Sequence, residues 1–178
     1  MRVRRELLLV LLLGSCASTR KQLERGAVYE REGMLQQAFE QYAELHARRP
    51  KSVEAHIGMK RAAQGLFDGL QARAMADYVM GDFAAGDQAR QQVLAYMSSM
   101  DSRDIDLQWN PLFDIRRKEA MQAEARRLYA AAEEAFRADR FAEAEALASQ
   151  CSKLDPERRD ADHLQKLAQV EPIYREGA

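Results

Sequence analysis

Apolar and polar residues follow one another with helical spacing over most of this chain. Between residues 35 and 48 the small or apolar positions are Leu35, Ala38, Tyr42 and Leu45. Steps of three and four place such residues on one face of a helix, and that face needs a partner to cover it. Residues 19–31 precede Gly33, a residue type suited to a helix end, and Pro50 stops the second helix. The segment from Gly26 to Pro50 therefore predicts a helical hairpin.

A second stretch near the C-terminus, residues 128–156, carries the same pattern. Its small or apolar positions are Leu128, Ala131, Ala132, Ala135, Ala144 and Ala148. Phe141 opens the second helix of this stretch as Leu35 opens that of the first. The interval from the small residue to the proline is twelve residues in both copies, 38 to 50 and 144 to 156. This agreement between distant segments predicts an internal repeat.

Both stretches resemble the tetratricopeptide repeat (TPR), whose pattern is W-x2-L-G-x2-Y, then A-x3-F, then P. The matching positions in the first copy are Gly26, Tyr29, Ala38, Tyr42 and Pro50. Gln22 and Arg25 stand where the family usually has Trp and Leu, so the first repeat is atypical. The resemblance implies antiparallel helical hairpins that stack on one another.

The middle of the chain predicts a longer and less regular pair of helices. No proline interrupts residues 53–80, where Gly65 and Gly69 are four apart, a spacing that allows close helix contact. Gly81-Asp82 ends this helix, and 83–98 forms a degenerate middle repeat. The three repeat frames are 48 and 58 residues apart, whereas the standard unit has about 34 residues. An irregular stack is therefore expected, and a compact bundle of helical hairpins is the alternative.

The rest of the chain predicts one loop and two further helices. The loop is 100–110, and Asn110 with Pro111 has the residue types of an N-cap and a first helical position. A helix of residues 112–138 should follow, and Asp155 should cap the last helix, which runs to about Tyr174. Because runs of Val, Ile and Thr are few, we expect an all-α protein of stacked antiparallel hairpins.

The first residues have the features of a processing signal. Arg2, Arg4 and Arg5 precede an apolar run of seven residues, 7–13, which is shorter than the roughly 20 residues that a membrane-spanning helix needs. The sequence Leu-Gly-Ser-Cys at positions 13–16 then resembles the lipobox of bacterial lipoproteins. An ordinary secretory signal that happens to contain a cysteine is the alternative.

The lipobox resemblance implies that residues 1–15 are a signal peptide and that the Cys16 thiol receives a diacylglycerol. Residues 16–18 would then be a tether, and residues 19–178 the TPR-like helical domain. Several acyl chains would hold the protein on a membrane, whereas one chain anchors it only marginally. Ala17 follows the cysteine where Asp is the usual inner-membrane retention signal, so the resemblance implies the periplasmic face of the outer membrane.

Charge and cysteine content exclude several functions. Without residues 1–15 the chain has 24 Lys and Arg against 27 Asp and Glu, and these charges give no basic field for nucleic acid. If Cys16 is acylated, Cys151 is the one remaining thiol, so an intramolecular disulfide cannot form. Cys151 lies on the apolar stripe after Phe141, so we expect it to be a small core residue.

No pattern of catalytic or metal-binding residues stands out. The histidines His46, His56 and His163 lack metal-ligand spacing, and the chain contains neither G-x-S-x-G nor H-E-x-x-H. We therefore expect neither an enzyme nor a cofactor or metal. The carboxylates recur at helical surface intervals, where pairs with Lys or Arg are usual.

Binding to another protein is the favoured function, since stacked hairpins form an extended concave surface. By resemblance to TPR proteins, the groove-facing residues lie on the first helix of each unit: Glu30, Arg31, Met75, Tyr78, Tyr129, Glu133, Phe136 and Arg137. The alternative for Tyr78, Tyr129 and Phe136 is a place in the core. Trp109, in the predicted loop, is either an exposed partner contact or a side chain packed on the helices.

The sequence therefore favours a TPR-like lipoprotein that serves as an adaptor or assembly factor for another envelope protein. TPR-containing pilotins of pilus secretins and accessory subunits of outer-membrane protein assembly are known lipoproteins of this kind. A regulator of a cell-wall synthase or hydrolase is the first alternative. A purely structural envelope lipoprotein is the second.

Overall fold

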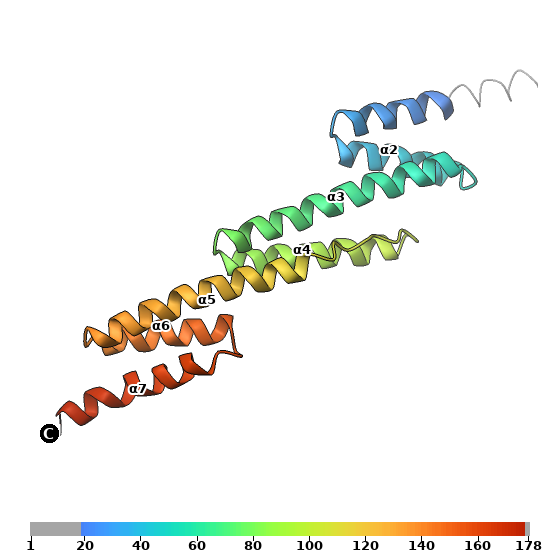
Figure 1. Cartoon of the computed structure of the whole chain (residues 1–178). Helices are drawn as coiled ribbons and strands as arrows, with labels where there is room; N and C mark the ends of the chain where they lie inside the picture. The colour runs from blue at the N-terminus through green and yellow to red at the C-terminus, as the bar shows by residue number, and fades with distance from the viewer. Residues whose placement is uncertain (1–18, 177–178) are drawn as a thin grey trace, which may run out of the picture. The chain divides into compact units, whose positions relative to one another are not determined.

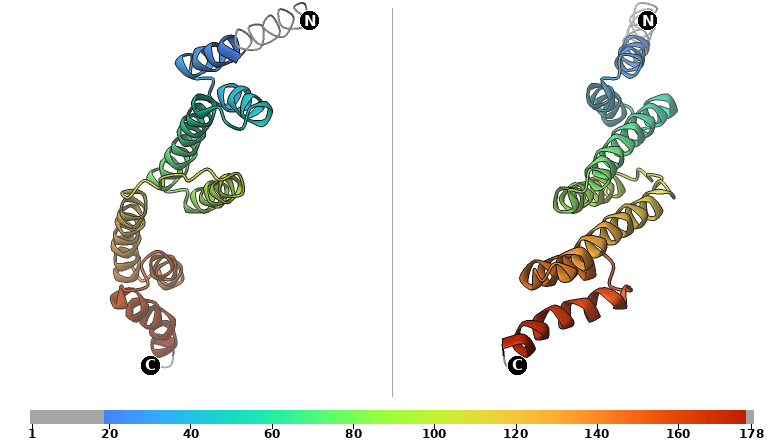
Figure 2. Two further views of the ribbon diagram at one scale, coloured as in Figure 1. Left: turned by 90° about the vertical axis from the view of Figure 1, so that its right-hand side faces the viewer. Right: turned by 60° about the vertical axis from the view of Figure 1, so that its left-hand side comes forward.

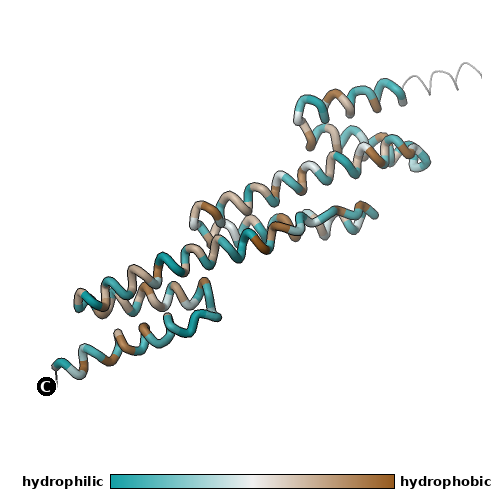
Figure 3. Tube along the Cα trace, in the orientation of Figure 1, coloured by the Kyte–Doolittle hydropathy of each residue, from teal (hydrophilic) through white to brown (hydrophobic). Residues whose placement is uncertain are grey.

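The structure is a computed structural model that describes residues 19–176, and this part of the chain is helical, with no strand. The first helix covers residues 19–31. The later helices are α2 (Leu35–Arg48), α3 (Val53–Val79), α4 (Phe83–Asp101), α5 (Phe113–Arg137), α6 (Phe141–Leu154) and α7 (Arg159–Glu176) (Figure 1). The expected all-α class is confirmed. Apolar and polar residues alternate along these helices (Figure 3), as the sequence pattern predicts.

The chain divides into two compact units. Among the described residues, unit 1 comprises residues 19–72 and 89–110, and unit 2 comprises residues 73–88 and 111–176. Unit 1 thus contains the first helix, α2, most of α3 and the second part of α4. Unit 2 contains the turn between α3 and α4 together with α5, α6 and α7. Each unit has its own core, described below.

Three helix–helix turns share one hydrogen-bond pattern, that of the Schellman motif. The residue after each first helix has a positive φ: Gly33 (72°), Gly81 (83°) and Asp139 (59°). Its N–H donates to the carbonyl three residues earlier at 3.1 Å in all three turns. The next N–H donates to the carbonyl five residues earlier, at 2.8 Å for Met34, 3.0 Å for Asp82 and 2.9 Å for Arg140. The same local geometry therefore starts α2, α4 and α6.

The segments 19–62 and 125–168 correspond at a constant offset of 106 residues. Helices α2 and α6 each contain 14 residues, and the next residues, Arg49 and Asp155, have nearly the same backbone angles (φ −138°, ψ 77° and φ −135°, ψ 82°). Each donates its N–H to the carbonyl four residues earlier at 2.9 Å. Pro50 and Pro156 then occupy equivalent turns. The correspondence therefore includes a third helix, because α7 corresponds to the start of α3.

Unit 2 has a core of three small layers, each with at least one residue from α5, α6 and α7. The layers contain Ala125, Leu128, Cys151 and Ala161; Ala132, Ala148 and Leu164; and Ala135, Ala144 and Ala168. Alanines let the three helices approach closely, and the views in Figures 1 and 2 agree that α6 lies beside both α5 and α7. Helix α7 thus covers the apolar face of the preceding hairpin.

The first three helices of unit 1 pack around Tyr42, which is 3% exposed. A Cβ atom added to Gly26 would lie 2.6 Å from this ring, and one added to Gly58 would lie 2.7 Å from it. The ring is therefore held between two glycines on neighbouring helices. By contrast, a Cβ atom on Gly69 would meet nothing within 4 Å, and one on Gly65 would meet only the flexible end of Leu35. The predicted close helix contact is thus present at Gly65, where a Cβ atom would lie 2.8 Å from Leu35 Cδ1 of α2, and absent at Gly69.

An extended segment in unit 1, residues 105–110 (the strap), runs along α3. The side chain of Gln64 holds its backbone, because the N–H of Gln108 donates to Gln64 Oε1 (2.8 Å) and Gln64 Nε2 donates to the carbonyl of Gln108 (3.0 Å). The N–H of Asn110 donates to Oε1 of the buried Gln71 at 3.1 Å. The side chains of Ile105 and Leu107, which belong to the strap, are buried.

Two predicted helix caps are wrong. Asn110 was expected to cap a helix with Pro111 as its first residue, but α5 begins at Phe113, because the backbone of Asn110 is bonded to Gln71. Asp155 was expected to cap the last helix, but it ends α6 through the bond of its N–H to the carbonyl of Cys151, and α7 begins at Arg159. The other predicted boundaries lie within a few residues of those observed.

None of the helices in residues 19–176 combines the length and the apolar character that a membrane span needs. The predicted signal peptide, residues 1–15, and the predicted lipidation site, Cys16, lie outside the described residues.

Candidate functional site

Three predicted binding residues occupy equivalent places. Glu30, Tyr78 and Phe136 each stand three positions before the left-handed residue of a hairpin turn. The side chain of Glu30 is 14% exposed. It accepts hydrogen bonds from Arg61 Nε (2.8 Å) and from the hydroxyl of Tyr42 (3.3 Å). Burial, followed by the charge of Glu30, raises the pKa of Tyr42. Glu30 thus ties the first helix to α2 and α3.

Tyr78 and Phe136 both pack against the residue that opens the next helix. Their ring centroids lie 6.3 Å from Phe83 and 5.4 Å from Phe141, respectively. Tyr78 is 1% exposed, and its hydroxyl donates to Asp87 Oδ1 at 2.6 Å. Arg117 of α5 lies over the Tyr78 ring, 5.1 Å from its centroid, and pairs with Asp87 at 3.0 Å. These contacts place Tyr78 in the core of unit 2, and burial raises its pKa.

The other predicted residues on first helices vary in exposure. Tyr129 is half-buried against two layers of the unit 2 core, and Arg158 lies over its ring at 4.6 Å. Glu133 and Arg137, one turn apart on α5, form an exposed ion pair of 3.5 Å. Arg31 is exposed, and Met75 is half-buried. In unit 2, Glu133 and Arg137 are thus the predicted residues with the most open side chains.

Trp109 packs on the helices of unit 1. Its ring is half-buried and meets Phe67 edge to face, with centroids 5.9 Å apart. Phe67 is fully buried and also stacks with Tyr96 at 6.4 Å. This aromatic group holds the end of the strap against α3 and α4. The packed alternative for Trp109 is therefore the arrangement that the structure shows.

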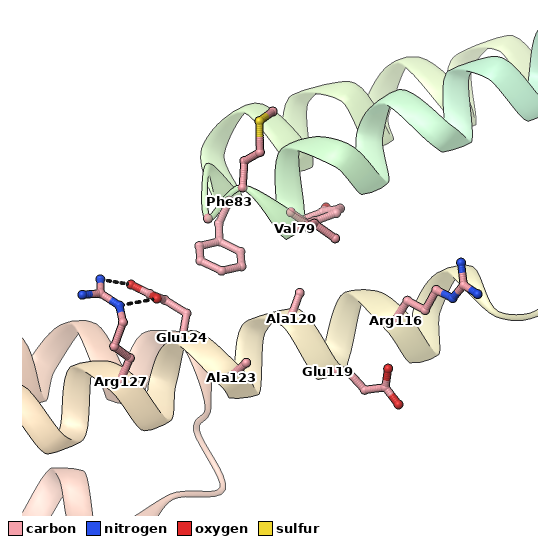
Figure 4. Close-up of a pocket in the computed structure, with 11 residues that line it drawn as sticks. Val79, Phe83, Arg116, Glu119, Ala120, Ala123, Glu124 and Arg127 are labelled. Atoms are coloured by element: carbon pink, nitrogen blue, oxygen red, sulfur yellow. Dashed lines mark hydrogen bonds and ion pairs between the residues drawn. The ribbon is translucent and has the colours of Figure 1, made fainter.

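Unit 2 also contains a groove, which offers a partner a larger surface than any one of these side chains. It has a volume of about 660 Å³ and lies between the α3–α4 turn and the middle of α5. Its lining residues are Tyr78, Val79, Met80, Gly81, Phe83, Arg116, Glu119, Ala120, Ala123, Glu124 and Arg127. Figure 4 shows Val79 and Phe83 on the turn facing α5, where the small side chain of Ala120 leaves the space open.

The groove joins apolar surface to fixed charges. Val79 and Met80 are 71% and 75% exposed, which is unusual for large apolar side chains side by side at a turn. Glu124 is hydrogen-bonded to Arg127 at 2.7 Å, and this bond lowers the pKa of the Glu124 carboxyl (Figure 4). Arg116 and Glu119 lie further along the same wall. Such a surface fits an apolar side chain with polar neighbours.

Sequence reasoning missed most of this groove. Tyr78 was predicted as a binding residue, whereas Val79, Met80, Ala120 and Ala123 were not. A signal was present in Val79-Met80 directly before Gly81, because two large apolar residues beside a left-handed turn cannot both face the core. The small residues of α5 carried no signal, since alanine is common in helices.

The described residues hold no group of three or more His, Cys, Asp or Glu side chains placed to bind a metal ion. Cys151 is fully buried, and its thiol donates to the carbonyl of Ala125 at 3.1 Å. Burial raises the pKa of this thiol, so it is predominantly protonated at neutral pH.

Comparisons with known protein families, with curated proteins and with solved structures find no match to this chain.

Proposed function

We propose that this protein is a TPR-like lipoprotein, anchored through Cys16 to the periplasmic face of the outer membrane, that holds or helps to assemble another envelope protein. The observation that carries the proposal is the recurrence of one hairpin turn at Gly33, Gly81 and Asp139. Recurring hairpins whose helices approach closely at small residues, such as Gly26, Ala132 and Ala148, favour a stacked repeat, and repeat proteins of this kind commonly bind other proteins. The lipobox-like sequence before Cys16 supports the anchor.

The groove of unit 2 is the surface that we assign to the partner. Its apolar wall, Val79 and Met80, is exposed, and Ala120 and Ala123 leave room on α5. Burial of a partner's apolar side chain there would remove about 25 cal/mol of unfavourable hydration per Å² of apolar surface. Anchoring would raise the local concentration near other membrane proteins, so that even a weak groove could act.

A crosslinking pulldown from membranes tests both parts of the proposal. The wild-type protein should capture a discrete envelope protein, and Cys16→Ala should lose most of it. Met80→Glu places a charge in the apolar wall and should reduce capture several-fold. Ile173→Glu is the matched control, because Ile173 is a similarly exposed apolar residue, 70% exposed, on α7 outside the groove.

The outcomes separate the alternatives. Capture of a secretin or a barrel-assembly subunit supports the adaptor, whereas capture of a peptidoglycan synthase or hydrolase supports the regulator. Equal capture by Met80→Glu and wild type contradicts the groove assignment. If the protein is processed and acylated but captures nothing, the structural alternative is favoured and the adaptor proposal is wrong.

A further inference from the structure

One end of unit 1 gathers basic side chains beside the start of the described chain. Thr19 and the α2–α3 connection line a shared hollow of about 610 Å³, with Arg49, Pro50, Lys51, Ser52 and Glu54. We call residues 19–21 and 48–54 the basic tip. Its cationic residues are Arg20, Lys21, Arg48, Arg49 and Lys51.

Covalent connection places the basic tip close to Cys16. Only three peptide units separate Cys16 from Thr19, and an extended chain spans at most about 3.6 Å per residue. The Cα atoms of these two residues therefore lie within about 11 Å of each other in any conformation. If Cys16 carries acyl chains in a bilayer, Thr19 must lie at the level of the lipid headgroups.

The charges of the basic tip are suited to a negatively charged surface. Arg20 pairs with Glu24 (3.0 Å) and Arg48 pairs with Glu44, each on its own helix. Counting these carboxylates and Glu54, five positive charges face three negative ones. Lys21 and Lys51 are exposed. The Debye length is about 10 Å at 0.1 M salt, so charges this close to the headgroups are only partly screened.

We propose that the basic tip binds anionic phospholipid headgroups and so fixes the end of unit 1 that faces the membrane. This inference rests on the proposed lipidation of Cys16. Basic residues beside an anchor strengthen membrane attachment, because electrostatic attraction and acyl insertion add. Val53, which is 64% exposed and directly follows the connection, would lie at the same surface.

Environment-sensitive fluorescence at Val53 provides the test. The mature acylated protein, made from the full chain with Val53→Cys, is labelled and reconstituted into phosphatidylcholine vesicles with or without phosphatidylglycerol. Cys151 does not compete for the label, because its side chain is fully buried. The control is Met34→Cys, at the opposite end of α2, where 14 helical residues of about 1.5 Å rise separate it from Arg49.

We expect the label at position 53 to shift to the blue and to be quenched by headgroup-labelled lipid in vesicles that contain phosphatidylglycerol. The label at position 34 should keep its aqueous spectrum. The double variant Lys21→Glu/Lys51→Glu should lose the quenching at position 53, and so should high salt. These changes leave acylation intact, so flotation of the vesicles with bound protein should persist.

The possible failures are distinct. Flotation without any change at position 53 overturns the basic tip and leaves the anchor standing. Equal quenching on neutral and anionic vesicles overturns the selection of anionic headgroups. Protein that fails to float overturns the proposed lipidation, and with it the argument that places Thr19 at the membrane.

Discussion

At the scale of single residues, Asp139 holds a conformation that costs a side-chain-bearing residue free energy. Its φ is 59°, whereas glycine occupies the equivalent position of the other two turns. We expect Asp139→Gly to stabilise the protein by about 0.5–1 kcal/mol, since the left-handed region is unfavourable for L-residues. The exposed ion pair of Asp139 with Arg175 would be lost, and such pairs contribute little. Thermal or denaturant unfolding measures the effect.

Gly33→Ala provides the opposite change for this test. It should destabilise by about 1 kcal/mol although the site has open space, because the penalty comes from φ and not from contact. A lower stability of Asp139→Gly than of wild type would show that the aspartate stabilises the turn by more than the backbone strain costs.

The glycines that contact Tyr42 give a second residue-scale prediction. Gly58→Ala should destabilise the protein by about 1–2 kcal/mol, because the added Cβ meets a ring that Gly26 prevents from moving away. Gly69→Ala, on the same helix α3, should instead stabilise by about 0.5–1 kcal/mol, since alanine is the better helix former and nothing lies within 4 Å. Denaturant unfolding of the two variants compares them. Equal shifts of both midpoints would contradict the close contact.

At the scale of elements, the strap has two glutamine side chains, Gln64 and Gln71, where a strand would have a neighbouring strand. These side chains hydrogen-bond its backbone. Gln64→Ala removes both side-chain bonds to the backbone of Gln108 and should loosen this segment. Trp109 is the one tryptophan in the chain, so its fluorescence reports the strap directly. We expect a red shift and stronger acrylamide quenching, with little change in helical circular dichroism.

Gln36→Ala is the control for this experiment. The Gln36 side chain bonds only to Glu40 on its own exposed helix face, so its removal should leave the Trp109 emission unchanged. An unchanged emission in Gln64→Ala as well would mean that the contact between Trp109 and Phe67 alone holds the strap.

Helix boundaries were predictable from this sequence where local signals agreed, and less predictable where tertiary contacts set the boundary. Gly33 and Pro50 mark the turns on either side of α2 so clearly that this helix begins and ends where expected, and Gly81 marks the end of α3 in the same way. The helix predicted at 112–138 begins at Phe113, but its predicted cap was wrong because the Asn110 backbone is hydrogen-bonded to Gln71, a residue 39 positions away. The binding face was harder still to predict from the sequence. Tyr78 has the residue type of an interface anchor, but its side chain is buried and hydrogen-bonded to Asp87, which makes it a core residue.

At the scale of the whole molecule, each unit has a core of its own, and Cys151 reports on the core of unit 2. The thiol is buried and protonated, so it should react with a thiol reagent only when this unit opens. Leu164→Ala removes a large side chain from the layer of Ala132 and Ala148 and should destabilise by about 2–4 kcal/mol. The reaction should then become at least about tenfold faster.

Gly58→Ala should leave this reaction rate nearly unchanged, since the contacts of Gly58 lie in unit 1. Reaction kinetics of the two variants under native conditions measure the difference. Equal acceleration by both would show that the two units open together.

The two corresponding segments also constrain how this chain could have diverged after a duplication. Gly26, Tyr42 and Gly58 in one segment stand where Ala132, Ala148 and Leu164 stand in the other. A tyrosine opposite an alanine would clash, and an alanine between two glycines would leave a cavity. Each single substitution on the way from one trio to the other therefore lowers the stability of the fold. These three positions must therefore change as a linked group, and close relatives should carry one trio or the other, seldom a mixture.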